Sequence, residues 1–114
     1  MDDELLIEFL NESREHLATI EADLLAIEEG GAHIDETLVN KVFRAAHSIK
    51  GAAANLRLTA VFELAQTMEK EARENRLEGA AFAIQAIREN LDRIGESLKQ
   101  RNGATQAKSV DLAF

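Results

Sequence analysis

Apolar residues recur at every third or fourth position along four separate stretches of this chain, and this spacing limits the possible folds more than any other feature. It is the period of an α-helix, which gathers such residues on one face. Proline is absent from all 114 residues, and aromatic residues make up only 4% of them. Alanine, leucine and glutamate, which favour helices, are abundant instead. We therefore expect an all-α protein.

The first two stretches have clear ends. One covers residues 3–29 and ends at Gly30-Gly31, where the backbone is free to leave the helix. Asp35 is placed to cap the second stretch, which runs to about Asn55. Their expected core-facing residues are Leu6, Leu10, Leu17, Ile20, Leu24 and Ile27 in the first and Leu38, Val42, Ala46, Ile49, Ala53 and Leu56 in the second.

The other two stretches have less distinct ends. The third begins at Thr59 and is expected to fray near Asn75 or Arg76. The fourth covers residues 79–101, and Asn102-Gly103 is its expected stop. Their expected core-facing residues are Val61, Ala65, Met68 and Ala72 in the third and Ile84, Ile87, Leu91, Ile94 and Leu98 in the fourth.

Short connections between four amphipathic helices favour an antiparallel up-down-up-down four-helix bundle. We expect residues 1–101 to form this bundle as one compact domain and residues 102–114 to form a tail or linker. The tail has no clear apolar period, so a short fifth helix at the C-terminus stays open as an alternative. Because the four apolar faces can bury one another, we expect the domain to be a monomer.

Charge and composition exclude several classes of function. The formal charge is −8, from 21 acidic and 13 basic residues, so neither nucleic acid nor an anionic membrane is an expected partner. Apolar runs are too short for membrane insertion, and the acidic start lacks the basic region of a secretory signal, so we expect a cytoplasmic location. Cysteine is absent, which excludes thiolate chemistry. No glutamate precedes a histidine at di-iron spacing, so no metal site is predicted.

The second helix carries a histidine on its outer face. At 100° per residue, His47 lies about 140° around the helix from the core residue Val42. Gly51 follows one turn later, in a position where glycine costs a helix about 1 kcal/mol relative to alanine. We interpret that glycine as clearance, because a side chain at position 51 would stand over the imidazole and block its approach.

Positive charge gathers around this histidine. Residues 37–62 contain Lys41, Arg44, Lys50 and Arg57 but no acidic residue, within a chain of strongly negative charge. Such a cluster would stabilise an anion beside the imidazole, most simply a phosphoryl group. Two alternatives stay open from the residues alone: an imidazole that handles an anion, and an inert surface histidine in a structural bundle that serves protein–protein interaction.

Residues 43–56, FRAAHSIKGAAANL, resemble the signature of histidine-containing phosphotransfer (HPt) domains, in which a histidine is followed after two residues by lysine and glycine. Residues 5–13, LLIEFLNES, and residues 63–69, ELAQTME, are similar to the amino-terminal phosphotransfer domain of the CheA chemotaxis kinases. The resemblance extends over roughly residues 3–100. Gln66 stands where domains of the CheA type often carry a second histidine.

The resemblance implies a phosphocarrier in two-component signalling rather than a stand-alone enzyme. His47 would accept a phosphoryl group from the ATP site of a histidine kinase catalytic domain and pass it to an aspartate of a response-regulator receiver domain. The chain has no phosphate-binding loop of its own. We therefore expect it to bind no cofactor, with ATP and Mg²⁺ held by the partner kinase.

The resemblance also implies roles for the neighbours of His47. Lys50 would neutralise the phosphoryl oxygens, Gly51 would give access, and Arg44 and Gln66 would assist. Glu69 would accept a hydrogen bond from Nδ1–H of the imidazole and leave Nε2 as the nucleophile. From the residues alone, Glu69 is more simply an exposed glutamate, paired with Lys41, Lys70 or Arg73.

Overall fold

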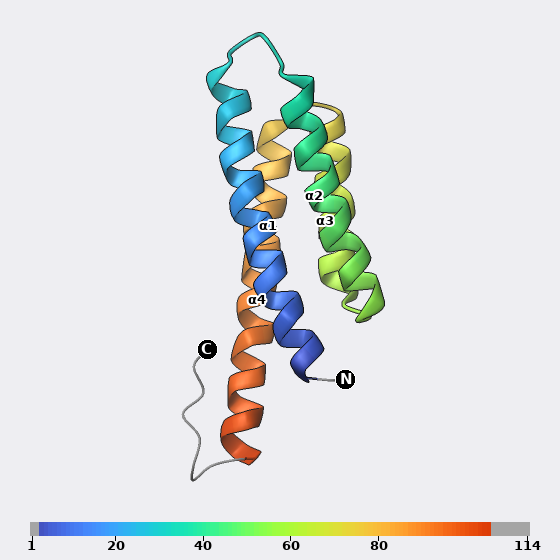
Figure 1. Cartoon of the computed structure of the whole chain (residues 1–114), viewed down its shortest axis with the longest axis vertical. Coiled ribbons are helices and arrows are strands. Elements are labelled where there is room, and N and C mark those ends of the chain that lie inside the picture. The colour runs from blue at the N-terminus through green and yellow to red at the C-terminus, as the bar shows by residue number, and fades with distance from the viewer. Residues whose placement is uncertain (1–2, 106–114) are drawn as a thin grey trace.

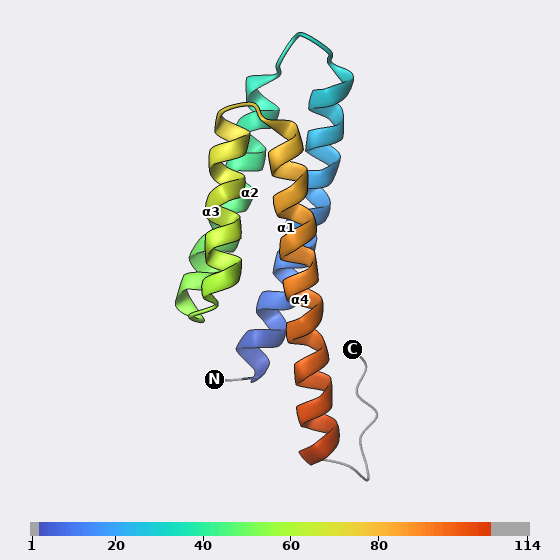
Figure 2. The ribbon, with the colours of Figure 1, turned by 180° about the vertical axis from the view of Figure 1, so that it is seen from behind.

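The computed structural model describes residues 3–105, which form four helices: α1 (Asp3–Glu29), α2 (Glu36–Asn55), α3 (Thr59–Arg73) and α4 (Leu77–Thr105). Successive helices run in opposite directions, and each packs against its neighbours in the chain while α4 closes the bundle against α1 (Figure 1). The all-α antiparallel bundle is therefore confirmed. Seen from behind, α4 extends past the ends of α2 and α3 (Figure 2).

Local signals set the boundary between α1 and α2 as expected. Gly31 takes a positive φ of 65° directly after α1, a conformation that glycine adopts without steric cost. The Asp35 carboxylate accepts hydrogen bonds from the backbone N–H groups of Thr37, at 2.9 Å, and Leu38, at 3.4 Å. These bonds satisfy donors that have no partner inside the helix.

Non-glycine residues end α2. Arg57 adopts a φ of 58°, its N–H donates to the carbonyl of Ala54 at 3.1 Å, and the N–H of Leu58 donates to that of Ala53 at 2.9 Å. This is the Schellman motif, which reverses the chain within two residues and lets α3 begin at Thr59.

The same motif ends α3, with Asn75 at a φ of 58°. Its geometry brings the chain back at once, so α4 begins at Leu77, two residues before the expected start. Gly79 therefore lies inside the helix, where a Cβ atom would meet the Glu71 side chain at 2.6 Å. This glycine permits a close approach of α3 and does not start the helix.

The expected stop at Asn102-Gly103 is wrong, because α4 continues through both residues to Thr105. Glycine permits a helix to end but does not require it, since the helical conformation remains open to it. The alternative of a short fifth helix in the tail, residues 102–114, is left with residues 106–114, which lie outside the described residues. No helix within residues 3–105 is both long and apolar enough to cross a membrane.

Most of the expected core-facing residues are buried between the four helices. Leu38, Leu56 and Ile94 are only half-buried at the edge of the core, and Val39 and Phe9 are buried although the pattern did not select them. An amphipathic helix is expected to place its acidic residues on the solvent-exposed face, and this expectation is wrong for Asp23. Asp23 is only 8% exposed, and its Oδ1 lies 3.5 Å from Nζ of Lys41. Its Oδ2 has no hydrogen-bond partner within residues 3–105.

Candidate functional site

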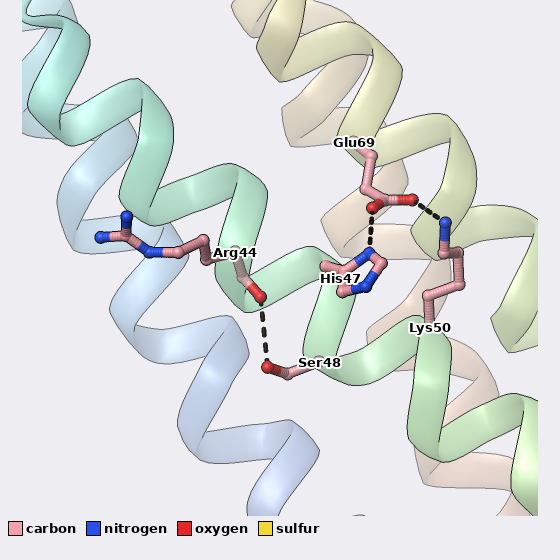
Figure 3. Close-up of polar contacts among 5 residues, drawn as sticks. All are labelled: Arg44, His47, Ser48, Lys50 and Glu69. Atoms are coloured by element: carbon pink, nitrogen blue, oxygen red, sulfur yellow. Dashed lines mark hydrogen bonds and ion pairs between the residues drawn. The ribbon is translucent and has the colours of Figure 1, made fainter.

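The imidazole of His47 projects from the outer face of α2 on the side of the neighbouring helix α3 (Figure 3). Its side chain is 63% exposed, while Val42 and Ala46 on the opposite face of α2 are fully buried. The structure thus places the ring at the surface, as the helical period predicts.

Glu69 meets this ring from α3. Its Oε2 lies 2.8 Å from Nδ1 of His47, and its Oε1 lies 2.6 Å from Nζ of Lys50. The residue is only 6% exposed. The interpretation of Glu69 as an exposed glutamate paired with Lys41, Lys70 or Arg73 is therefore wrong, because the carboxylate is buried between two residues of α2.

The charge state of Glu69 follows from these contacts. Burial alone would raise the pKa of its carboxyl, but hydrogen bonds and charge interactions with Lys50 and His47 outweigh burial, and the pKa lies below its ordinary value of 4.5. Glu69 is therefore a carboxylate at neutral pH and can only accept hydrogen bonds.

This carboxylate determines the tautomer of a neutral His47. An acceptor at 2.8 Å from Nδ1 requires the proton to be on Nδ1, so the lone pair is on Nε2. Nε2 points away from Glu69 in Figure 3. The arrangement presents a nucleophilic nitrogen at the surface of the bundle, with the other nitrogen held by a buried anion.

Gly51 leaves open space one turn after His47. A Cβ atom at this position would meet no atom of the described chain within 4 Å, so a methyl group there would not touch the imidazole. The expected clash between a residue 51 side chain and the ring is therefore wrong for alanine. The space above Gly51 can matter only for larger side chains or for a molecule that approaches from outside.

The remaining residues predicted for the site do not all lie close to the imidazole. Lys50 lies beside His47 but pairs with Glu69. The guanidinium of Arg44 points away from the imidazole in Figure 3, and the Arg44 carbonyl accepts a hydrogen bond from Ser48 at 3.2 Å. Gln66 lines a hollow beside Glu69, but no hydrogen bond within the described residues joins Gln66 to His47.

Two contacts around His47 were not predicted. The ring of Phe43, one turn earlier on α2, stacks with the imidazole at a centroid distance of 6.2 Å and an interplanar angle of 18°. The guanidinium of Arg73 on α3 lies 4.2 Å from the centroid of Phe43. The helical period places Phe43 and Arg73 one turn from His47 and Glu69, but the contacts depend on how α2 and α3 face each other, which the apolar pattern does not show.

Comparison with known proteins identifies the family of this chain. The Hpt domain profile matches residues 4–97. The chain belongs to the Hpt domain family. An Hpt domain is an all-α phosphotransfer domain, in agreement with the four-helix bundle and with the exposed histidine on α2.

Relatives of this Hpt domain are chemotaxis proteins. It is 32% identical over 110 residues to the chemotaxis protein CheA of Rhizobium meliloti, a match that covers 91% of this chain and 14% of that protein. It is 39% identical over 61 residues to the chemotaxis protein CheA of Bacillus subtilis, covering 54% of this chain and 9% of that protein. The chain thus spans only a small part of the relatives that it matches. No solved structure matches it.

Proposed function

We propose that His47 is the phosphoacceptor of this Hpt domain and that the domain carries phosphoryl groups in a signalling system of the CheA type. One observation supports this proposal above the others. The imidazole is exposed, and the buried Glu69 carboxylate lies 2.8 Å from its Nδ1, which leaves Nε2 as a free nucleophile.

The first step is transfer from ATP, held with Mg²⁺ in the catalytic domain of a partner histidine kinase. The lone pair of His47 Nε2 forms a bond to the γ-phosphorus, and the bond from that phosphorus to the bridging oxygen of ADP breaks. ADP leaves with the electron pair. The proton on Nδ1 stays in place, so the phosphorylated ring is a cation, and the negative charge of Glu69 stabilises it.

The second step is transfer to an aspartate of a response-regulator receiver domain. A carboxylate oxygen of that aspartate bonds to phosphorus while the bond between phosphorus and Nε2 breaks. The electron pair returns to Nε2, and the neutral imidazole with its proton on Nδ1 is restored. No proton leaves the ring in either step, so Glu69 acts by holding one tautomer and by its charge.

Lys50 has a part in both states. In the structure its ammonium group lies 2.6 Å from Oε1 of Glu69, within the same group of side chains as the imidazole. A phosphoryl group on Nε2 would add about two negative charges next to it. We propose that Lys50 then shares its charge between Glu69 and the phosphoryl oxygens, with Gly51 leaving room for the group and Arg44 and Gln66 in supporting positions.

The partners would dock over the exposed part of α2. A hollow of about 390 Å³ lies at the turn between α2 and α3, lined by residues that include Ala54, Leu58 and Phe62. It offers apolar surface two turns along the helix from His47, beside the positive charge of Arg57. We propose that the receiver domain covers this hollow during transfer, in a small and transient interface, and that the reaction takes place in the cytoplasm.

A phosphorylation assay tests the proposal. The domain is incubated with labelled ATP and a cognate histidine kinase catalytic domain, and the expected product is an acid-labile, base-stable label on the domain. The label should be absent from His47→Gln and should move to a receiver domain when one is added. His16→Gln is the matched control, because His16 is a histidine of α1 that lines the groove between α1 and α2 and not the surface between α2 and α3. Persistence of the label in His47→Gln would assign the phosphoacceptor elsewhere, and no label on the wild type would favour an inert structural bundle.

A further inference from the structure

Two neighbouring side-chain contacts join α2 to α3. One joins His47 to Glu69, and the other joins Phe43 to Arg73. Phe43 lies one helical turn before His47, and Arg73 lies one turn after Glu69. Because α2 and α3 run in opposite directions, these offsets place the second pair at the next level of the same helix interface.

The two contacts are connected through the rings. Phe43 stacks with His47 at an interplanar angle of 18° and a centroid distance of 6.2 Å. Arg73 lies over Phe43, with its guanidinium carbon 4.2 Å from the ring centroid, within the range of a cation–π interaction. Phe43 and Arg73 also line a hollow of about 290 Å³ together with Lys50 and Glu69. The stack is therefore part of the surface next to the nucleophile.

The hydrogen bond to Glu69 does not by itself determine the orientation of the imidazole. It restrains Nδ1, but coupled rotations about the Cα–Cβ and Cβ–Cγ bonds can still tilt the ring plane while this contact is kept. A neighbouring ring in nearly parallel orientation limits this tilt. The direction of the Nε2 lone pair depends on the ring plane, and displacement at phosphorus needs the attacking nitrogen to be aligned with the bond that breaks.

Arg73 can hold Phe43 in turn. Its guanidinium is planar and stacks on aromatic faces, which the compact ammonium group of lysine does less well. Phe43 is only half-buried, so the packing of the core alone does not fix its ring. A cation over the ring therefore helps to keep Phe43 in place.

We propose that Phe43 and Arg73 are positioning residues that hold the imidazole plane of His47 so that Nε2 faces an approaching phosphoryl donor. The inference rests on the proposed phosphoacceptor role of His47. Neither residue touches the reacting atoms in this assignment. Phe43 acts on the imidazole directly, and Arg73 acts through Phe43.

The test uses a donor that needs no partner protein. Phosphoramidate transfers its phosphoryl group to histidine as the ring nitrogen bonds to phosphorus and ammonia leaves, and ³¹P NMR follows the product. The variants are Phe43→Leu, Phe43→Tyr and Arg73→Lys. Phe82→Leu is the matched control, because Phe82 is 75% exposed on α4. Thermal unfolding followed by circular dichroism verifies that each variant is folded.

A second measurement reports on the ring itself. In ¹⁵N-labelled protein, the chemical shifts of Nδ1 and Nε2 give the tautomer of His47, and the line widths of its ring protons report motion of the ring. A residue with only a structural role would change stability and leave these signals unchanged in the folded variant. The measurement needs no phosphoryl transfer, so it is independent of the proposed function.

Loss of the stack should slow phosphorylation of Phe43→Leu by about tenfold. The ring signals of His47 should show greater motion, and Phe43→Tyr should restore both readouts. Arg73→Lys should show a smaller effect in the same direction, about two- to threefold. Unchanged rates and ring signals in Phe43→Leu, with wild type phosphorylated, would overturn this inference and leave the phosphoacceptor role intact. If wild type itself takes up no phosphoryl group from any donor, the proposed function fails instead.

Discussion

Oε2 of Glu69 lies 2.8 Å from Nδ1 of His47, so a buried carboxylate on α3 meets an exposed imidazole on α2. The carboxylate keeps its negative charge because Lys50 contacts its other oxygen at 2.6 Å. The two residues differ in burial, and their roles differ accordingly. Glu69 is held in place by its surroundings, and His47 is accessible to other molecules.

Replacement of Glu69 by glutamine should slow phosphorylation of His47 by about tenfold or more. An amide oxygen can still accept a hydrogen bond from Nδ1–H, but it provides no negative charge for the cationic phosphorylated ring. The rate is measured with a kinase catalytic domain and with phosphoramidate. Glu63→Gln is the control, because Glu63 is an exposed glutamate on the same helix. Equal rates for wild type and Glu69→Gln would remove Glu69 from the mechanism while leaving His47 as the acceptor.

Lowering the pH should reduce the free energy of unfolding of the wild type more than that of Glu69→Gln. The pKa of Glu69 in the folded chain is held below its ordinary value of 4.5, so the carboxylate form favours folding. This contribution is complete above the pKa of the unfolded chain and is lost as the pH falls through the folded-state pKa. Urea unfolding of both proteins at about pH 7 and about pH 3 measures the difference. If the difference in free energy of unfolding between the two proteins is no smaller at the acid pH, the contacts of Glu69 do not stabilise its charged form.

Substitutions of Gly51 should separate its effect on stability from its effect on access to His47. Gly51→Ala should raise the free energy of unfolding by about 0.5–1 kcal/mol, because alanine favours the helix and its Cβ meets no described atom within 4 Å. Gly51→Leu should fold but slow transfer from a kinase, since its longer side chain fills the open space beside His47. Rapid transfer to Gly51→Leu would show that this space is not needed for docking.

The ion pair between buried Asp23 and exposed Lys41 should respond asymmetrically to mutation. Asp23→Leu removes a buried carboxylate whose Oδ2 lacks a hydrogen-bond partner in the described part of the chain, so stability should stay within about 1 kcal/mol of wild type or rise. Lys41→Met leaves that carboxylate without its cation and should cost about 1–3 kcal/mol. Chemical denaturation measures both. A larger loss in Asp23→Leu than in Lys41→Met would contradict this account.

Helix ends were predictable where the signal is carried by one side chain or one glycine. The Asp35 cap and the Gly31 turn are of this kind, because the chemistry lies within a few residues of the boundary. Of the left-handed turns that end α2 and α3, Asn75 carries such a signal, since asparagine tolerates this conformation, and Arg57 carries none. The start of α4 was misplaced because Gly79 lies within the helix, at its contact with Glu71, and does not precede it.

The site was predictable in its residues and less so in its contacts. The helical period alone places His47 at the surface, and the resemblance to HPt domains pointed to Glu69. The burial of Glu69 and of Asp23 could not be read from the pattern, which assigns acidic residues to solvent. The stack of Arg73, Phe43 and His47 depends on the register between two helices, and a period measured along one helix carries no information on that register.

The tight turn at Arg57 joins the two helices that carry every side chain discussed at the site, and α2 and α3 pack against each other more extensively than any other pair. The side chains of the candidate site thus all lie on a single helical hairpin, within residues 43–73. Its contacts lie within one hairpin, so loop closure between the two helices is short compared with closure over the whole chain. The buried apolar residues of α1 and α4 pack against this hairpin and complete the core beneath it.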